Sequence, residues 1–202
     1  MKIRTFPFGP LGGNCYLCTN DLDTDAVVID PIAPPDVVLK SINKNIKIHF
    51  ILITHSHFDH MLSYESWRAY NIPVAAMAEE IPAFLSPTIN LNAVFCGKPI
   101  VYSVPEIPLK DQQILHFANQ NVKVIATPGH TLGSCCYLID GALFSGDTVF
   151  AEGNYGRTDF PTGNSEALFT SIRKLCTLDD DVTVYPGHGV KEKMKNIKSV
   201  FG

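Results

Sequence analysis

The chain of 202 residues lacks an apolar run long enough to cross a membrane. A membrane-spanning helix needs ~20 consecutive apolar residues, and a secretory leader needs a shorter apolar core behind its basic start. MKIRTFPFGP, at residues 1–10, has neither feature. We therefore expect a cytoplasmic protein without a membrane partner.

Basic residues are scarce as well. The 16 lysines and arginines are outnumbered by 20 aspartates and glutamates, which gives a formal net charge of -4. Nucleic-acid partners need clustered basic side chains to neutralise phosphates, so we exclude them and expect a small-molecule substrate. A Gly-x-Ser-x-Gly motif, which would position a nucleophilic serine, is also missing.

The six cysteines do not form a zinc-ribbon pattern. Cys15 and Cys18 have a Cys-x-x-Cys spacing, but a zinc ribbon needs a second such pair, and the sequence contains none. A lone pair in a cytoplasmic protein predicts reduced thiols, several of them buried in strands.

What the sequence does contain predicts a layered α/β protein. With 46% hydrophobic and 18% charged residues, the chain suffices for one substantial core, so we predict a single domain over 1–202. Apolar segments rich in β-branched and aromatic residues predict strands at 1–8, 14–20, 26–30, 48–54, 73–77, 113–117, 122–127, 134–140, 142–146 and 182–186. Helices are expected at 34–43, 59–71, 78–85, 165–176 and 190–200. Strand runs interrupted by helices favour sheets inside and helices outside. Residues 86–107 have no clear period and predict a loop or subdomain near the site, or a connector.

The segment ITHSHFDH (53–60) crowds histidines behind an aliphatic strand. Side chains alternate along a strand, so His55, His57 and Asp59 project to one side if the extension continues. His60 joins them if the chain turns around Asp59. Four potential ligands thus come from one short segment.

Two further segments, VKVIATPGH (122–130) and VTVYPGH (182–188), each run an apolar strand into Pro-Gly-His. They place His130 and His188 in tight turns at strand ends, where α/β proteins present ligands. Asp147 in SGDT has the same setting. The other two histidines, His49 and His116, lie within strand patterns, and we assign them to structure.

Imidazole and carboxylate without paired thiolate form a ligand set suited to zinc, iron or manganese. Seven such ligands exceed what one four- or five-coordinate ion uses. We therefore predict two divalent metal ions per chain, with zinc favoured and iron or manganese as alternatives, and one carboxylate between them. Histidines that merely occupy turns would not need this combination of patterns.

THSHFDH (54–60), TPGHT (127–131), SGDT (145–148) and YPGHG (185–189) resemble, in order, the four ligand motifs of the metallo-β-lactamase fold superfamily. The resemblance spans almost the whole chain. It implies an αβ/βα four-layer sandwich with the metal site at one edge, between two sheets. It also implies a ligand set of His55, His57 and His130 on one metal, Asp59, His60 and His188 on the other, and Asp147 bridging them.

Within that superfamily, GRTDFPTG (156–163) resembles the single-domain branch grouped with glyoxalase II, the hydroxyacylglutathione hydrolases. This branch implies hydrolysis of thioesters of the S-lactoylglutathione type. Full glyoxalase II has a C-terminal helical region that holds glutathione, whereas this sequence ends at Gly202. β-Lactamases of this fold have a cysteine near the position of Asp147 and lack the histidine matching His60, so the resemblance disfavours antibiotic hydrolysis.

The predicted reaction is hydrolysis by a metal-bound hydroxide, because metals lower the pKa of water from ~15.7 to about 7. Asp59 or Asp147 would orient the water or accept its proton. We therefore predict a binuclear metal-dependent hydrolase, most simply a thioesterase for small thioesters.

Two alternatives stay open, and a third is disfavoured. Persulfide dioxygenases share the His-x-His-x-Asp-His motif and bind one iron, by resemblance through His55, His130 and Asp147. Another small ester or a lactone is a second possible substrate. An inactive binding module would lack ligands, whereas all seven positions are filled here. The oligomeric state is not predicted.

Two residues are candidate substrate contacts. Arg157 has the planar guanidinium that binds a carboxylate through two hydrogen bonds. The alternative, which we favour, is an ion pair with Asp159 that shapes the loop. Tyr155 beside it is expected to line the pocket.

Overall fold

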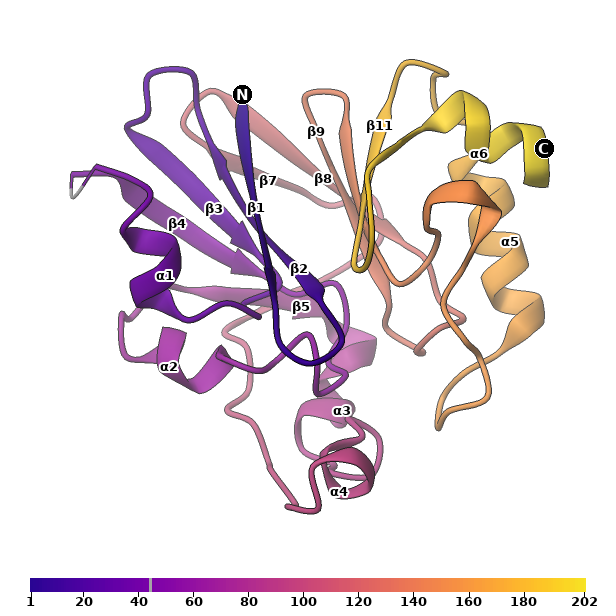
Figure 1. The fold of residues 1–202 in the computed structure, drawn as a ribbon, viewed down its shortest axis with the longest axis horizontal. Coiled ribbons are helices and arrows are strands. Elements are labelled where there is room, and N and C mark those ends of the chain that lie inside the picture. Colours follow the sequence, from indigo (N-terminus) through magenta and orange to yellow (C-terminus); the bar gives the residue numbers. More distant parts are fainter. Residues whose placement is uncertain (44) are drawn as a thin grey trace.

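The computed structural model describes residues 1–43 and 45–202. Two six-stranded sheets pack face to face, and helices cover their outer faces (Figure 1). The predicted layered α/β architecture is confirmed.

The first sheet has the strand order β1-β2-β3-β4-β5-β6. Its strands are β1 (Lys2–Phe8), β2 (Gly13–Thr19), β3 (Asp25–Ile29), β4 (Lys47–Leu52), β5 (Val74–Met77) and β6 (Ile107–Leu109). The pairs β1/β2 and β2/β3 are antiparallel, and the remaining pairs are parallel. Parallel neighbours need a crossover, which α1 (Pro35–Leu39) provides between β3 and β4 and α2 (Tyr64–Arg68) between β4 and β5.

The second sheet has the order β12-β11-β10-β9-β8-β7. Its strands are β7 (Ile114–Phe117), β8 (Gln120–Ala126), β9 (Cys135–Ile139), β10 (Ala142–Gly146), β11 (Thr183–Pro186) and β12 (Glu192–Lys193). Because β9 is antiparallel to both β8 and β10, and β11 is parallel to β10, the strands β8, β10 and β11 run in one direction. Their carboxyl ends therefore meet at one edge.

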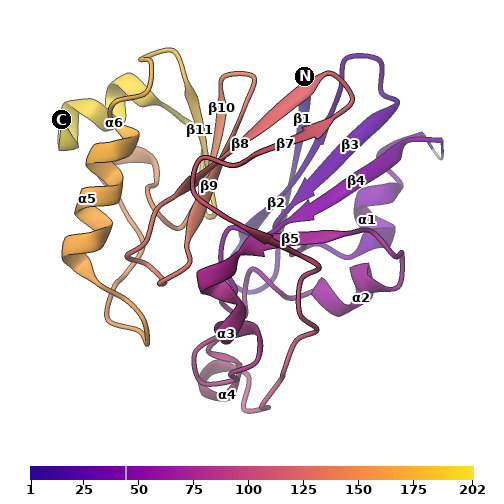
Figure 2. The same cartoon turned by 180° about the vertical axis from the view of Figure 1, so that it is seen from behind.

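Side-chain alternation divides the core into three apolar layers. In β2, Tyr16 and Cys18 point into the layer between the sheets, whereas Cys15 and Leu17 point toward α1 and α2. The second sheet packs its outer face against α5 (Ser165–Leu175) and α6 (Met194–Phe201). Figure 2 shows these helices on the opposite side of the molecule from α1 and α2. The predicted αβ/βα four-layer sandwich is confirmed.

Three predicted helices are shorter than expected: the helix expected at 34–43 is restricted to α1, which ends at Leu39, and two others begin late. The helix expected at 59–71 is restricted to α2, because residues 58–63 form turns, in which the His60 amide donates to the His57 carbonyl over 2.9 Å. The helix expected at 190–200 begins only at Met194, because Glu192 and Lys193 pair with β11 as β12. In these last two places a tertiary contact overrides the local helical preference.

The segment 86–107, for which no period was predicted, contains α4 (Asn92–Phe95) and leads into β6. Leu91 precedes α4 with a left-handed φ of 67°, and the Phe58 amide donates to the Asn90 carbonyl over 2.9 Å, which places this segment beside the histidine-bearing one. Pro108 lies in β6, at the edge of the sheet, where a missing amide donor is tolerated. The expected helix at 78–85 is present as the 3₁₀ turn η1 (Ala78–Glu80) followed by α3 (Ile81–Phe84), and η2 (Ala151–Gly153) is a second 3₁₀ turn.

All six cysteines are free thiols, as predicted, and Cys15 and Cys18 are buried on opposite faces of β2. Over residues 1–43 and 45–202, we find no helix with the length and apolar character that a bilayer crossing requires.

Candidate metal centre

The site lies at the edge where four strands end and both sheets contribute. β4, β8, β10 and β11 lead into the segments that carry the predicted ligands. Backbone hydrogen bonds join the sheets there: the Asn14 amide donates to the Gly187 carbonyl over 2.7 Å, and the Cys135 amide donates to the Thr54 carbonyl over 3.0 Å. Ligands from distant parts of the chain are thereby held in one frame.

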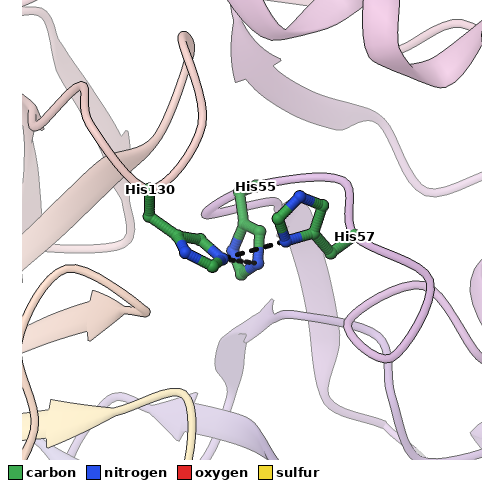
Figure 3. Close-up of side chains that lie close together, drawn as sticks. All are labelled: His55, His57 and His130. Atoms are coloured by element: carbon green, nitrogen blue, oxygen red, sulfur yellow. Dashed lines mark hydrogen bonds between the residues drawn. The ribbon is translucent and has the colours of Figure 1, made fainter. Parts of the chain in front are cut away.

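His55, His57 and His130 form what we call the first ligand group. The Nε2 atom of His130 is 3.2 Å from Nε2 of His55 and 2.9 Å from Nδ1 of His57 (Figure 3). All three side chains are buried. Three imidazole nitrogens thus converge on one point, as one metal ion would require.

Asp59, His60 and His188 form the second ligand group. Nε2 of His188 is 3.1 Å from Oδ2 of Asp59 and 3.4 Å from Nε2 of His60. Asp147 lies between the groups, with Oδ1 3.3 Å from Nε2 of His60 and Oδ2 3.6 Å from Nε2 of His130. The structure therefore brings all seven expected residues together and places Asp147 between the two groups.

In three histidines, the outer ring nitrogen, which points away from the other ligands, lies beside a hydrogen-bond acceptor. Nδ1 of His60 faces Oδ2 of Asp30 at 2.8 Å, Nδ1 of His130 donates to the carbonyl of Arg157 at 2.7 Å, and Nδ1 of His188 donates to the carbonyl of Leu11 at 3.1 Å. When the outer nitrogen of a neutral imidazole carries the proton, the inner nitrogen presents a lone pair. Each ring is thus oriented as a ligand.

The ligand nitrogen and oxygen atoms that face one another inside the site are arranged as if around a cation. Lone pairs and carboxylate oxygens face one another at 2.9–3.7 Å, an arrangement that is repulsive without positive charge between them. Among the described residues, two buried side-chain atoms have no hydrogen-bond partner: Oδ1 of Asp147, which faces the second ligand group, and Nε2 of His57, whose Nδ1 is the nitrogen that faces His130. Imidazole and carboxylate are ligands suited to zinc, iron and manganese.

Burial sets the protonation of His55 and His57 in the first ligand group. It holds the pKa of His55 well below the ordinary value and lowers the pKa of His57 to about 3, so both rings are neutral at pH 7. Burial opposes the ionisation of Asp147, but the neighbouring His60, His130 and His188 outweigh it and hold the pKa of this carboxyl far below its usual range. Neutral imidazole and ionised carboxylate are the forms that bind metals.

His60 behaves differently from the first ligand group. Burial lowers its pKa, but the carboxylates of Asp147 and Asp30 outweigh burial and raise the pKa of His60 well above its ordinary value. A cation in this place therefore has to displace a proton from the ring.

Asp30, which follows β3 in VVIDP, is a functional residue that we did not predict. Its carboxylate accepts hydrogen bonds from the amide and hydroxyl of Thr54, at 2.8 and 2.7 Å, and contacts His60. It joins the end of β3 to the ligand-bearing segment after β4. A carboxylate at the end of a buried strand was the available signal in the sequence.

Glu80 is the second residue that we missed. One oxygen of its buried carboxylate accepts from the amide and hydroxyl of Ser56, at 2.8 and 2.7 Å. The other accepts from the hydroxyl of Thr131 at 2.8 Å and from the amide of Gly133 at 3.0 Å. Glu80 therefore clamps the segment that bears His55 to the segment that bears His130.

The Pro-Gly-His turns need glycine for packing reasons. A Cβ at Gly187 would lie 2.2 Å from Oδ1 of Asp147 and 2.7 Å from Cε1 of His60. A Cβ at Gly129, whose φ is 140°, would lie 2.3 Å from the backbone of Leu168 in α5. Gly187 thus allows the turn to approach the ligands closely, and Gly129 allows its turn to pack against α5.

A cavity of about 440 Å³ opens onto the ligands. It is lined by Leu11, His57, Phe58, Asp59, Leu91, Phe95, His130, Asp147, Phe150, Tyr155, Gly156, Arg157, Phe160 and His188. Tyr155 and Arg157, the two candidate substrate contacts, both line this cavity. The ion pair that we favoured for Arg157 is also present, with its Nε and Nη2 each 2.6 Å from a carboxylate oxygen of Asp159.

The remaining histidines pair away from the ligands. His49 contacts Asp25 and His116 contacts Asn121, and both lie in strands. This agrees with their assignment to structure.

Solved structures of similar shape cover almost the whole chain. The crystal structure of BLEG-1, described as a B3 metallo-beta-lactamase, has a TM-score of 0.88 and 30% identity, over 96% of this chain and 95% of that one. TTHA1623 in a di-iron-bound form has a TM-score of 0.83 and 28% identity, over 98% of both chains. ETHE1 from Myxococcus xanthus has a TM-score of 0.79 and 25% identity, over 100% of this chain and 83% of that one.

Among relatives, the probable metallo-hydrolase YqgX of Bacillus subtilis is 31% identical, over 94% of this chain and 90% of its own. The hydroxyacylglutathione hydrolase GloC of Haemophilus influenzae is 30% identical, over 94% and 91%. BaeB of Bacillus velezensis, a probable polyketide biosynthesis zinc-dependent hydrolase, is 31% identical, over 89% and 74%.

The family model of the metallo-beta-lactamase superfamily matches residues 8–188, a span that includes all seven converging ligands. The similar structures agree in the arrangement of the two sheets. On this ground, the chain belongs to the metallo-beta-lactamase superfamily.

Proposed function

We propose that this protein is a binuclear metal-dependent hydrolase that cleaves small thioesters, either of the S-lactoylglutathione type or with another acyl group. The observation that carries the proposal is the position of Asp147, whose two oxygens face the first and the second ligand groups. Relatives named as metallo-hydrolase, zinc-dependent hydrolase and hydroxyacylglutathione hydrolase support the reaction class.

The first ligand group would hold one divalent ion, the second group would hold another, and Asp147 would contact both. When bound, such ions supply Lewis acidity toward the scissile carbonyl and acidify a water molecule. Zinc is the ion we favour, and the di-iron form of TTHA1623 keeps iron as an alternative.

Protein groups would orient the substrate and handle protons. Asp59 lines the cavity and is mostly buried, with Oδ2 3.1 Å from His188. A carboxylate there can orient the attacking water or accept its proton. Phe58, Phe150 and Phe160 line the same cavity and limit the access of bulk water. Arg157 and Tyr155 are proposed to touch the substrate at the entrance.

The GRTDF segment supports the metal site more directly than it supports one substrate. The carbonyl of Arg157 orients His130, and a Cβ at Gly156 would lie 2.8 Å from Nδ1 of His130. The assignment to thioesters therefore rests on the relative GloC and on the motif resemblance.

A mono-iron oxidoreductase of the persulfide dioxygenase type is the second candidate. Its two histidines and one carboxylate would be His55, His130 and Asp147, and Nε2 of His130 lies 3.2 Å from His55 and 3.6 Å from Asp147. The convergence of the four other ligands favours the hydrolase, because one iron would leave them unused.

One experiment separates the candidates. Metal analysis of the purified protein is combined with turnover of S-lactoylglutathione, turnover of a chromogenic β-lactam, and oxygen uptake with glutathione persulfide, and chelator-treated protein is the control. We expect two metal ions per chain and metal-dependent thioester turnover. One iron per chain with oxygen uptake and no thioester cleavage would reject the proposal, and dominant β-lactam turnover would replace thioesters by lactams.

A further inference from the structure

We propose that the cavity beside the ligands selects an apolar acyl group, so that the substrate is a thioester of an aliphatic or aromatic acid in preference to S-lactoylglutathione. This inference rests on the proposed hydrolase function and names the substrate class of the same site. It rests on the aromatic side chains that form one wall of the cavity and on the small number of basic side chains there that could bind a charged substrate.

The wall is a continuous set of aromatic rings. Phe58 stacks on Phe95 with ring centroids 5.2 Å apart and an interplanar angle of 16°. Phe160 meets Phe95 edge-on at 5.7 Å and also meets the ligand His57 edge-on at 5.8 Å. The apolar surface therefore extends from α4 to the first ligand group, where the scissile carbonyl would lie.

Large apolar side chains also stand at the mouth of the cavity. Leu11 is 57% exposed, Phe95 is 52% exposed and Tyr155 is 44% exposed. Apolar side chains grouped around a cavity and left in water mark a binding surface. An acyl chain or an aryl ring would cover them and recover the hydrophobic free energy of their burial.

Charged partners for a glutathione peptide are scarce. Among the described residues that line the cavity, Arg157 is the single lysine or arginine. Its guanidinium pairs with Asp159 through two bonds and lies 4.0 Å from the centroid of the Phe160 ring. The same cavity contains the carboxylates of Asp59 and Asp147, which oppose an anionic substrate until cations offset them.

The polarity of the acyl group points the same way. A lactoyl group has a hydroxyl, which loses hydrogen bonds to water when it packs against phenyl rings. A butyryl or benzoyl group has no such loss. Discrimination therefore arises on the acyl side of the thioester.

The test is an acyl series on the metal-loaded full chain, with N-acetylcysteamine as the common leaving thiol. In each reaction water adds to the carbonyl carbon, the C–S bond breaks, and a carboxylic acid and a thiol are released. Each methylene that becomes buried should raise kcat/KM about fourfold. We expect a rise of about fifteenfold from acetyl to butyryl, and faster cleavage of the benzoyl thioester than of the lactoyl thioester of the same thiol.

A variant and a matched control locate the effect. Phe95→Ala removes one ring of the wall and should reduce kcat/KM about fivefold or more for butyryl and benzoyl thioesters, and less than twofold for the acetyl thioester. Val94→Ala alters the preceding residue of α4, which is 62% exposed and does not line the cavity. It should leave the whole series unchanged.

Equal rates across the series, a preference for the lactoyl thioester within it, or equal losses for all acyl groups in Phe95→Ala would overturn the inference. If no thioester is cleaved, the proposed function fails separately, and the inference is then decided by binding. Calorimetry on the metal-loaded protein should find benzoate at least about tenfold tighter than acetate, and equal affinities would overturn the inference.

Discussion

The two ligand groups differ in how firmly the protein holds them. His55, His57 and His130 are all buried, and Glu80 ties their two segments together with four hydrogen bonds. His188 of the second group is 25% exposed and is oriented by the carbonyl of Leu11. The first group is therefore fixed entirely within the folded core, whereas the second combines the buried His60, held by Asp30, with the partly exposed His188.

This difference indicates which of the two ions should bind more tightly. Ligands whose orientation is fixed by neighbouring hydrogen bonds lose less freedom when the metal binds. We expect the first group to retain its ion at a chelator concentration that empties the second. The order of loading is thus encoded in the support of the ligands rather than in their chemical type.

Asp147→Asn should have the largest effect because it removes the carboxylate that faces both groups. We expect kcat to fall on the order of 10³-fold and the metal content to drop below two ions per chain. Metal analysis and steady-state kinetics check this, with Asp140→Asn at an exposed position as the control. Full metal content in Asp147→Asn would show that this residue is not the bridge.

Glu80→Gln should weaken the first group selectively. All four partners of Glu80 are donors, so the amide nitrogen of glutamine would face a donor and leave it unsatisfied. We expect the tighter ion to bind about 10–100-fold more weakly. The free energy of unfolding should fall by about 2 kcal/mol.

The matched control for Glu80 is its exposed neighbour, in the variant Glu79→Gln. Competition with a chelating dye and thermal unfolding should find this control unchanged. If Glu80→Gln weakened both ions equally, the clamp would not be specific to the first group.

Asp30→Asn should weaken metal binding at the second ligand group selectively. This carboxylate orients His60, so the weaker ion should lose about 10-fold in affinity while the tighter ion is retained. The same dye competition, read as two separate binding steps, measures this difference. Loss of the tighter ion first would contradict the assignment of the groups.

The smallest effect is expected far from both groups, at the ion pair between Arg68 and Glu106. The bond to Arg68 lowers the pKa of Glu106 to about 2, from 4.5. Because the folded pKa is the lower one, the stabilisation is present above about pH 4.5 and is lost as pH falls toward 2. Glu106→Gln should lower the free energy of unfolding by less than about 1 kcal/mol at pH 7, since the pair is half-exposed. The difference in unfolding free energy between this variant and the parent protein should shrink as pH falls from 7 to 3.

The sequence predicted the ligands because each follows a strand whose apolar pattern is local. The direction of β8, β10 and β11 then brings His130, Asp147 and His188 to one edge. Asp30 and Glu80 escaped prediction because their partners are 24 or more residues away in sequence. Nothing in the local sequence distinguishes buried Glu80 from exposed Glu79.

Short elements escaped prediction for a related reason. β6 and β12 are three and two residues long and exist through pairing with β5 and β11. The helical period at 59–71 is real in composition, but the turn that brings His60 to the centre replaces its first part. Tertiary contacts decide such segments, and a local pattern does not contain them.

The hydrogen bond from His188 to the carbonyl of Leu11 spans 177 residues of sequence and lies beside the bridge between Gly13 and His188. An ion bound by both His60 and His188 would therefore link the first third of the chain to its C-terminal part. Because such an ion binds only when β11 has docked, it stabilises the folded state by mass action. Metal loading thereby couples catalytic competence to the completion of folding, and a chelator should lower the unfolding temperature as well as the activity.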